Sequence, residues 1–348
     1  MQAPQLTGLA EDDIGLLARI HYATHTADFS RARAFYRALG YSVGFGDFPL
    51  TNTHQMARAL GMFDLCQYEL EVGEVIALPD APSPAAIDLL QFKVPFNDEP
   101  PYELPNHLGM AYAAFASADF DADVAALTAL GVPMLSAPAM DHEGRFVFFR
   151  DPDGVLYRLQ EGSGAVVPGR GMQIYDMPYI AINVSNLGQS IAFYERLGYE
   201  VQGAIADQEG DAATGAAWGL DGPYRYRTVD ITAPRGDRHR LRLTQWLMPY
   251  DPAPPYPAPI NHIGIHRIAV LVSDLDRAVG ILKAQGVPFL SELAPCCSGT
   301  GEDESGIVHV LDPDGVFVEL VGAIARRGPQ PQPDHCPALQ IRYPARAN

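Results

Sequence analysis

The chain has 348 residues, 47% of them hydrophobic and 19% charged, which is the composition of a globular protein long enough for two domains. Its formal net charge of −18 argues against nucleic acid or an anionic membrane as the main partner. No run of about 18 apolar residues occurs, so no transmembrane helix is expected.

The N-terminus and the cysteines predict a cytoplasmic protein. Residues 1–15 carry acids and lack a basic segment followed by an apolar one, so no signal peptide is expected. Four cysteines in a chain of this length do not predict a disulfide framework. We expect unpaired thiols in loops, with a redox-active Cys296-Cys297 pair as the alternative; the others are Cys66 and Cys336.

The first predicted unit begins with an apolar strand at residues 20–26. Asp28 follows as a candidate helix cap, and about ten helical residues then end at Gly40. Three short strand-like runs come after this helix. The same order recurs at residues 179–198 and 267–286, and less regularly at 112–131. The sequence therefore predicts four β-α-β-β-β units.

Two longer motifs show that the halves of the chain are a tandem duplication. The helix sequence AFYRALGY at residues 34–41 returns as AFYERLGY at residues 192–199. The sequence Asn-His-x-Gly at residues 106–109 returns at residues 261–264. The distance along the chain between the two copies is similar for both motifs, which is typical of duplicated domains.

A second pair of motifs, Asp-Pro-Asp-Gly at residues 151–154 and 312–315, lies between apolar runs near the end of each half. Proline presets φ for the first turn position, and glycine accepts the positive φ of a tight turn. Both motifs predict hairpins that lead into a final strand.

The helix motif, the terminal hairpin and the four units resemble the vicinal oxygen chelate superfamily, which includes glyoxalase I, bleomycin-resistance proteins and extradiol dioxygenases. The resemblance covers about residues 17–322 and implies an α+β fold with two tandem lobes, each an incomplete mixed-sheet barrel around a cleft. The implied lobes are residues 17–160, with units 17–95 and 106–160, and residues 175–322, with units 175–248 and 261–322; a proline-rich tail, 323–348, follows.

In that superfamily the metal ligands project from the first and last strands of paired units. The resemblance places His21, Tyr112, Tyr179 and Arg267 on first strands, and Asp88, Arg158, Arg242 and Glu319 on last strands. Because the connectors between units are short, we expect units adjacent in the chain to pair. One cleft would then hold His21, Asp88, Tyr112 and Arg158, and the other Tyr179, Arg242, Arg267 and Glu319.

Under this pairing no metal is expected, because a guanidinium at a ligand position repels a divalent ion. Asp88 would face Arg158, and Glu319 would face an arginine. Extradiol dioxygenase chemistry is disfavoured, since neither cleft has two histidines and a carboxylate. The alternative pairing of the first unit with the fourth would join His21, Asp88 and Glu319 and would permit a divalent metal.

The resemblance implies a glyoxalase-like protein that acts on a small oxygen-rich or anionic metabolite by lyase or isomerase chemistry. His21 would be the base beside Asp88, Arg158 would stabilise an enolate, and Tyr112 would donate or orient a proton. The alternatives are a metal-free binding or resistance protein for a drug-like aromatic molecule, and a regulatory protein with inactive clefts.

Further side chains are expected near the ligand. His21 and His25 lie on the same face of the first predicted strand, because side chains alternate between the two faces of a strand. Residues 51–62 and 208–220 are candidate lids, and His107 and His262 are expected to tie the proline-rich connectors to the sheets. The candidate substrate-binding side chains are His25, Tyr179, Arg242, Arg267, Glu319 and Trp246. The expected partner is a small molecule, and homodimerisation is left open.

Overall fold

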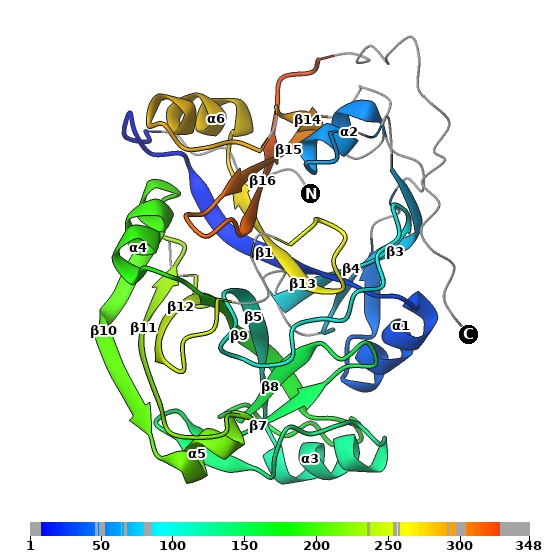
Figure 1. Ribbon diagram of the computed structural model, residues 1–348. Coiled ribbons are helices and arrows are strands. Elements are labelled where there is room, and N and C mark those ends of the chain that lie inside the picture. Colours follow the sequence, from blue (N-terminus) through cyan, green and yellow to red (C-terminus); the bar gives the residue numbers. More distant parts are fainter. Residues whose placement is uncertain are drawn as a thin grey trace.

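The computed structural model contains four copies of one unit (Figure 1). It describes residues 8–45, 48, 53–63, 65, 68–79, 85–234, 237–252, 256, 258–290, 292–296 and 304–327. Unit 1 has β1 (Leu16–His25), α1 (Phe29–Ala38), β2 (Val43–Phe45), α2 (His54–Ala59), β3 (Glu69–Ala77) and β4 (Ala86–Val94). Unit 2 has β5 (Gly109–Ser117), α3 (Phe120–Ala129), β6 (Ala139–Asp141), β7 (Gly144–Arg150) and β8 (Leu156–Glu161).

The second half of the chain repeats this order. Unit 3 has β9 (Ile174–Asn183), α4 (Leu187–Arg196), β10 (Glu200–Gly210), α5 (Ala212–Ala217), β11 (Tyr224–Thr232) and β12 (Arg240–Met248). Unit 4 has β13 (Gly264–Val272), α6 (Leu275–Ala284), β14 (Ala294–Pro295), β15 (Ser305–Leu311) and β16 (Phe317–Ala323). In every unit the first strand pairs in parallel with the last strand, and the remaining strands follow antiparallel. The predicted α+β fold and the common strand order of the two halves are confirmed.

The predicted pairing of units is wrong. The first sheet has the order β14-β15-β16-β13-β1-β4-β3-β2, so it joins unit 4 to unit 1; the second, β10-β11-β12-β9-β5-β8-β7-β6, joins unit 3 to unit 2. Figure 1 shows β1, in blue, running antiparallel beside β13, in yellow. The connector at residues 95–105 can reach roughly 35 Å when extended. A short connector therefore does not force neighbouring units into one sheet.

Units that adjoin in the chain still contact each other, through the two repeated motifs. The Tyr36 hydroxyl of α1 donates to Asp151 of the unit 2 hairpin at 2.9 Å, and Tyr194 of α4 donates to Asp312 of the unit 4 hairpin at 3.4 Å. The second aspartate of each Asp-Pro-Asp-Gly motif accepts hydrogen bonds from the segment before the corresponding helix. For example, the Ser185 amide donates to Asp314 at 2.9 Å. Both motifs thus serve to pack unit 1 on unit 2 and unit 3 on unit 4.

Local signals in the helices are confirmed. The Asp28 side chain caps α1 by accepting from the Arg31 amide at 3.1 Å, and Asn186 and Asp274 cap α4 and α6 in the same way. Gly40 ends the first helix at φ 105°, a conformation that favours glycine. No helix within the described residues is long and apolar enough to cross a membrane.

The expectation of unpaired loop thiols is wrong at Cys296, which is disulfide-bonded. The described part of the chain contains no free cysteine. Cys66, Cys297 and Cys336 lie outside the described residues, as does the tail beyond residue 327.

Candidate functional site

The first sheet brings four of the candidate side chains together, one from each of its central strands. His21 comes from β1, Asp88 from β4, Arg267 from β13 and Glu319 from β16. Arg267 bridges the two carboxylates, with Nε 2.8 Å from Glu319 Oε2 and Nη2 2.9 Å from Asp88 Oδ2. His21 Nε2 lies 4.0 Å from Asp88 and 3.9 Å from Glu319. These four residues are called the first centre below.

The first centre is buried but incompletely hydrogen-bonded. Asp88, Arg267 and Glu319 are 2%, 6% and 5% exposed, and the His21 side chain is 15% exposed. Within the described residues, His21 Nε2, Asp88 Oδ1 and Arg267 Nη1 are buried and make no hydrogen bond. Buried polar atoms normally have partners, so these three atoms are candidates for contact with a bound molecule.

The two carboxylates of the first centre differ in their ionisation. Burial raises the pKa of Asp88, and the attraction of Arg267 does not cancel this rise. Burial acts in the same direction on Glu319, but there Arg267, His21 and His309 together outweigh it, and the pKa falls well below its usual range. Glu319 is therefore the fixed negative partner of Arg267, and Asp88 is the carboxylate that accepts a proton more readily.

A cavity of about 130 Å³ lies directly against the first centre. Apart from the four polar residues, Tyr68 and Cys296, its walls are apolar side chains: Ile20, Phe48, Met56, Leu60, Leu70, Leu90, Phe92, Ile307 and Val321. Met56 belongs to α2 and Leu60 caps it, and α2 lies beside β14 in Figure 1. Gln55 Nε2 donates to the Leu293 carbonyl at 3.0 Å and holds α2 there. Of the candidate lid at residues 51–62, the described part thus contributes Met56 and Leu60 to the wall of this cavity, and residues 51 and 52 lie outside the described residues.

One histidine close to the first centre was not predicted. His309 on β15 is fully buried, with Nε2 4.0 Å from Glu319 Oε2, and burial lowers its pKa to about 4. Its position could have been inferred from Ile307, which lines the cavity, because residues two apart on a strand share a face.

The second sheet brings together the other four candidates, Tyr112, Arg158, Tyr179 and Arg242, which are called the second centre below. Neither arginine is free. Arg158 Nη2 lies 2.8 Å from Asp141, and Arg242 lies 2.8 Å from Asp230 through Nε. Glu143 also binds Arg242, with Nη2 to Oε1 at 2.7 Å. Asp141, Glu143 and Asp230 were missed because they lie on an edge hairpin and on a strand with no motif.

The second centre is almost closed, with a cavity of only about 10 Å³. Aromatic rings surround it, including Trp218 at the end of α5, Tyr226 on β11 and Trp246 on β12. Trp218 lies over the site as expected for the second candidate lid, with its ring centroid 5.8 Å from that of Trp246. Trp246, a predicted ligand contact, donates to Asn183 at 3.1 Å.

The predicted assignments of whole clefts are therefore corrected. His21 and Asp88 are in one centre, whereas Tyr112 and Arg158 are in the other, so the predicted base and enolate stabiliser do not share a site. Asp88 faces Arg267 and not Arg158. The expectation that Glu319 faces an arginine is confirmed by its contact with Arg267.

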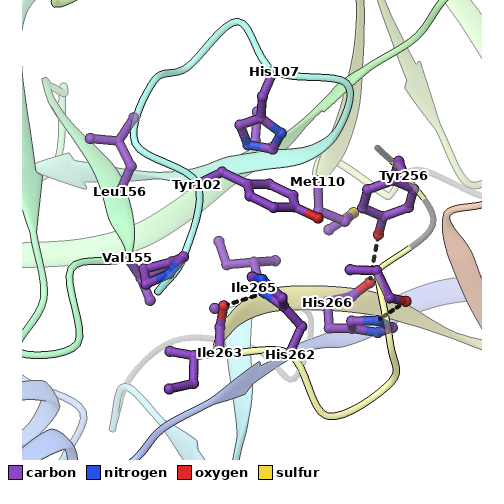
Figure 2. Close-up of a pocket in the computed structure, with 14 residues that line it drawn as sticks. Tyr102, His107, Met110, Val155, Leu156, Tyr256, His262, Ile263, Ile265 and His266 are labelled. Atoms are coloured by element: carbon purple, nitrogen blue, oxygen red, sulfur yellow. Dashed lines mark hydrogen bonds between the residues drawn. The ribbon is translucent and has the colours of Figure 1, made fainter. Parts of the chain in front are cut away.

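A third, small cavity of about 20 Å³ lies between the two sheets, where the repeated Asn-His-x-Gly motifs meet (Figure 2). The Tyr102 ring lies between His107 and His262, with ring centroids 4.3 and 4.9 Å away. Each histidine donates through Nδ1 to the carbonyl of the next residue at 2.8 Å. The space suffices for about one water molecule. A structural role for both histidines is thus favoured.

Other buried histidines surround this junction. His25 donates to the His262 carbonyl at 3.1 Å and stacks on His266, with ring centroids 5.6 Å apart. His25 also touches Phe92, which lines the cavity of the first centre, but does not line that cavity itself. His25 therefore supports the wall of the cavity and is not one of its polar contacts.

These histidines should make the free energy of unfolding fall in acid. Burial lowers the pKa of His266 to about 3 and that of His107 to about 4. The unfolded chain takes up protons below about pH 6.5 while the folded protein does not, so stability is lost as the pH falls from about 6.5 toward 4. Replacing His266 by Asn should reduce the slope of unfolding free energy against pH by about 1.4 kcal/mol per unit. Urea unfolding of both proteins from pH 4.5 to 6 measures this difference; equal slopes would contradict it.

The comparisons with known proteins agree with this geometry. The family model described as "Glyoxalase/Bleomycin resistance protein/Dioxygenase superfamily" matches residues 19–159 and 176–320. The chain belongs to this superfamily. Comparison with curated protein sequences gave no significant match.

Solved structures share the fold at low sequence identity. A point mutant of glyoxalase I from Zea mays is 17% identical, with a TM-score of 0.56, covering 88% of this chain and 92% of that one. Glyoxalase I from the same plant has a TM-score of 0.53 at 17% identity, with the same coverage. A putative dioxygenase from Bacillus subtilis is 10% identical, with a TM-score of 0.54, covering 89% of this chain and 86% of that one. At these identities the likeness concerns the fold.

The superfamily implies a metal between its paired units, but the side chains of the first centre do not fit one. Arg267 holds both carboxylates and places a fixed positive charge between them. Within the part of the chain that the structure describes, no group of three or more His, Cys, Asp or Glu side chains is arranged to hold an ion. In the second centre the acids Asp141, Glu143 and Asp230 are ion-paired with Arg158 and Arg242, so guanidinium groups stand where a cation would bind.

Proposed function

We propose that the protein binds a small, neutral, mostly apolar molecule with one hydroxyl or carbonyl group in the cavity of the first centre. The observation that carries this proposal is the 130 Å³ apolar cavity, into which the polar first centre projects from one side. An apolar cavity of about 150 Å³ accommodates a benzene ring. The apolar walls would hold the body of the molecule, and the first centre its oxygen.

The polar atoms favour a neutral oxygen. Arg267 offers a buried N–H, Asp88 an acceptor oxygen, and His21 Nε2 either role. Because two carboxylates outnumber the one guanidinium, the centre carries no excess positive charge to attract an anion. An anionic metabolite, which the sequence allowed, is therefore disfavoured here.

One observation favours a second candidate, proton-transfer chemistry of the lyase or isomerase type. His21 faces the cavity, and its Nε2 lies about equally far from Asp88 and Glu319. In this function His21 would accept a proton from the carbon next to a carbonyl, and Arg267 would stabilise the enolate oxygen. Hydrogen–deuterium exchange at that carbon of a bound ketone, followed by NMR, should occur in the wild type and be lost in His21→Gln.

Filling the cavity tests the binding proposal directly. Leu70→Trp adds bulk to a buried wall residue, so p-cresol should raise the thermal unfolding midpoint of the wild type and leave that of Leu70→Trp unchanged. Ile205→Trp is the matched control, because Ile205 is exposed on β10 and lines none of the three cavities. An equal shift in Leu70→Trp would place the cresol elsewhere and contradict the proposal.

A further inference from the structure

Glu143 occupies the second centre in the manner of a bound carboxylate. It lies in the turn between β6 and β7, outside the strands that carry the two arginines. Its oxygens accept from both Nη atoms of Arg242, one at 2.7 Å, and from the Tyr179 hydroxyl at 3.3 Å. Arg158 Nη2 lies 3.7 Å away. Two parallel N–H bonds to one carboxylate are the geometry by which arginine recognises carboxylate ligands.

The charges leave a place for one anion. Without Glu143, the ion-paired side chains here are the arginines Arg158, Arg240 and Arg242 and the acids Asp141 and Asp230, which leaves one positive charge in excess. Arg158 is 1% exposed, lines the cavity, and has a buried Nε that makes no hydrogen bond within the described residues. A monoanion would restore the balance that Glu143 now provides.

The walls indicate what the anion would carry. Tyr112, Trp218, Tyr226 and Trp246 line the cavity with rings and suit a flat aromatic group. With Glu143 in place only about 10 Å³ remains, too little for an organic molecule. An aromatic anion can therefore enter only when the Glu143 side chain leaves.

The turn that carries Glu143 is placed where it can move without breaking the sheet. β6 has three residues, is the edge strand of the second sheet, and within the described residues pairs only with β7. Gly144, which follows Glu143, has φ 111°, a value open to glycine and strained for other residues.

We propose that the second centre is a binding site for an aromatic monocarboxylate, which displaces Glu143 as a tethered competitor. The carboxylate would take the Glu143 contacts with Arg242 and Tyr179, and the ring would lie among the tryptophans. This site is separate from the cavity of the first centre and does not depend on the function proposed for that cavity.

Tryptophan fluorescence reports on this site alone, because the chain has two tryptophans and Trp218 and Trp246 both line it. Titration with phenylacetate should change the emission of the wild type weakly and that of Glu143→Ala at concentrations at least tenfold lower, since a tethered competitor acts at millimolar or higher effective concentration. The neutral isostere 2-phenylethanol should bind neither protein in this way. Glu143→Gln, which removes the charge and keeps the size, should also bind phenylacetate more tightly than the wild type.

Glu161→Ala is the matched control. It removes the same negative charge, but from a glutamate that pairs with Arg145 on the surface. Its phenylacetate titration should equal that of the wild type. If Glu143→Ala does not fold, the Glu143→Gln titration decides the question. Equal affinity of the wild type and both Glu143 variants for phenylacetate, or no binding to any of them, would overturn the proposal and leave Glu143 as a structural ion-pair partner.

Discussion

Replacing Arg267 by alanine is expected to lower the free energy of unfolding by about 3–5 kcal/mol, the range for breaking a buried ion pair by removing one partner. The substitution leaves Asp88 and Glu319 buried without their shared cation. Urea unfolding at pH 7 measures the change. Because the two carboxylates can then be neutralised by protons, the loss should be smaller near pH 5 than at pH 7.

Arg31→Ala is the control for this experiment. Arg31 also pairs with an aspartate, Asp153 at 2.9 Å, but its side chain is 52% exposed. Exposed ion pairs contribute about 0–1 kcal/mol, so this variant should be nearly as stable as the wild type. Equal losses of unfolding free energy in the two variants would show that Arg267 contributes no more than an exposed ion pair does. This result would contradict the ion-pair account of the first centre.

The second large effect is expected from Arg267→His. This substitution removes the fixed cation and adds an imidazole next to His21, Asp88 and Glu319, which together form a nitrogen and oxygen ligand set suited to a divalent ion. At a Zn²⁺ concentration 1,000 times its Kd, binding would stabilise the folded variant by about 4 kcal/mol. Thermal unfolding with and without Zn²⁺ measures this shift.

Arg267→Lys is the matched variant, since it keeps the positive charge and supplies no imidazole. Zn²⁺ should leave its unfolding midpoint, and that of the wild type, unchanged. A Zn²⁺ shift in the wild type as large as that in Arg267→His would mean that Arg267 does not exclude a metal from the first centre.

The units and their internal strand order could be predicted because their signals are local. A cap such as Asp28, a terminating glycine such as Gly40 and the Asp-Pro-Asp-Gly turns each act within a few residues. The pairing of units could not be predicted in this way. It depends on contact between β1 and β13, which are far apart in the chain, and the first strands of all four units are similarly apolar.

For the candidate site, the strand positions of the side chains could be predicted from the sequence, whereas their grouping could not. The two sheets bring the eight ligand-position side chains together in two groups of four, because each side chain follows from its place on a strand. Their companions Glu143 and His309 were missed: one lies in an edge turn, and the other is a single polar residue within an apolar strand. Charge balance was the remaining signal, because buried arginines such as Arg158 and Arg242 require acidic partners.

A crystal structure of the protein with p-cresol, recorded with anomalous data in the presence of Zn²⁺, tests the account most directly. We expect the cresol ring between Leu90 and Phe92, its hydroxyl within hydrogen-bond distance of His21 Nε2 or Arg267 Nη1, and no anomalous peak at the first centre. A zinc ion between His21, Asp88 and Glu319 with Arg267 displaced, or cresol bound only outside this cavity, would contradict it.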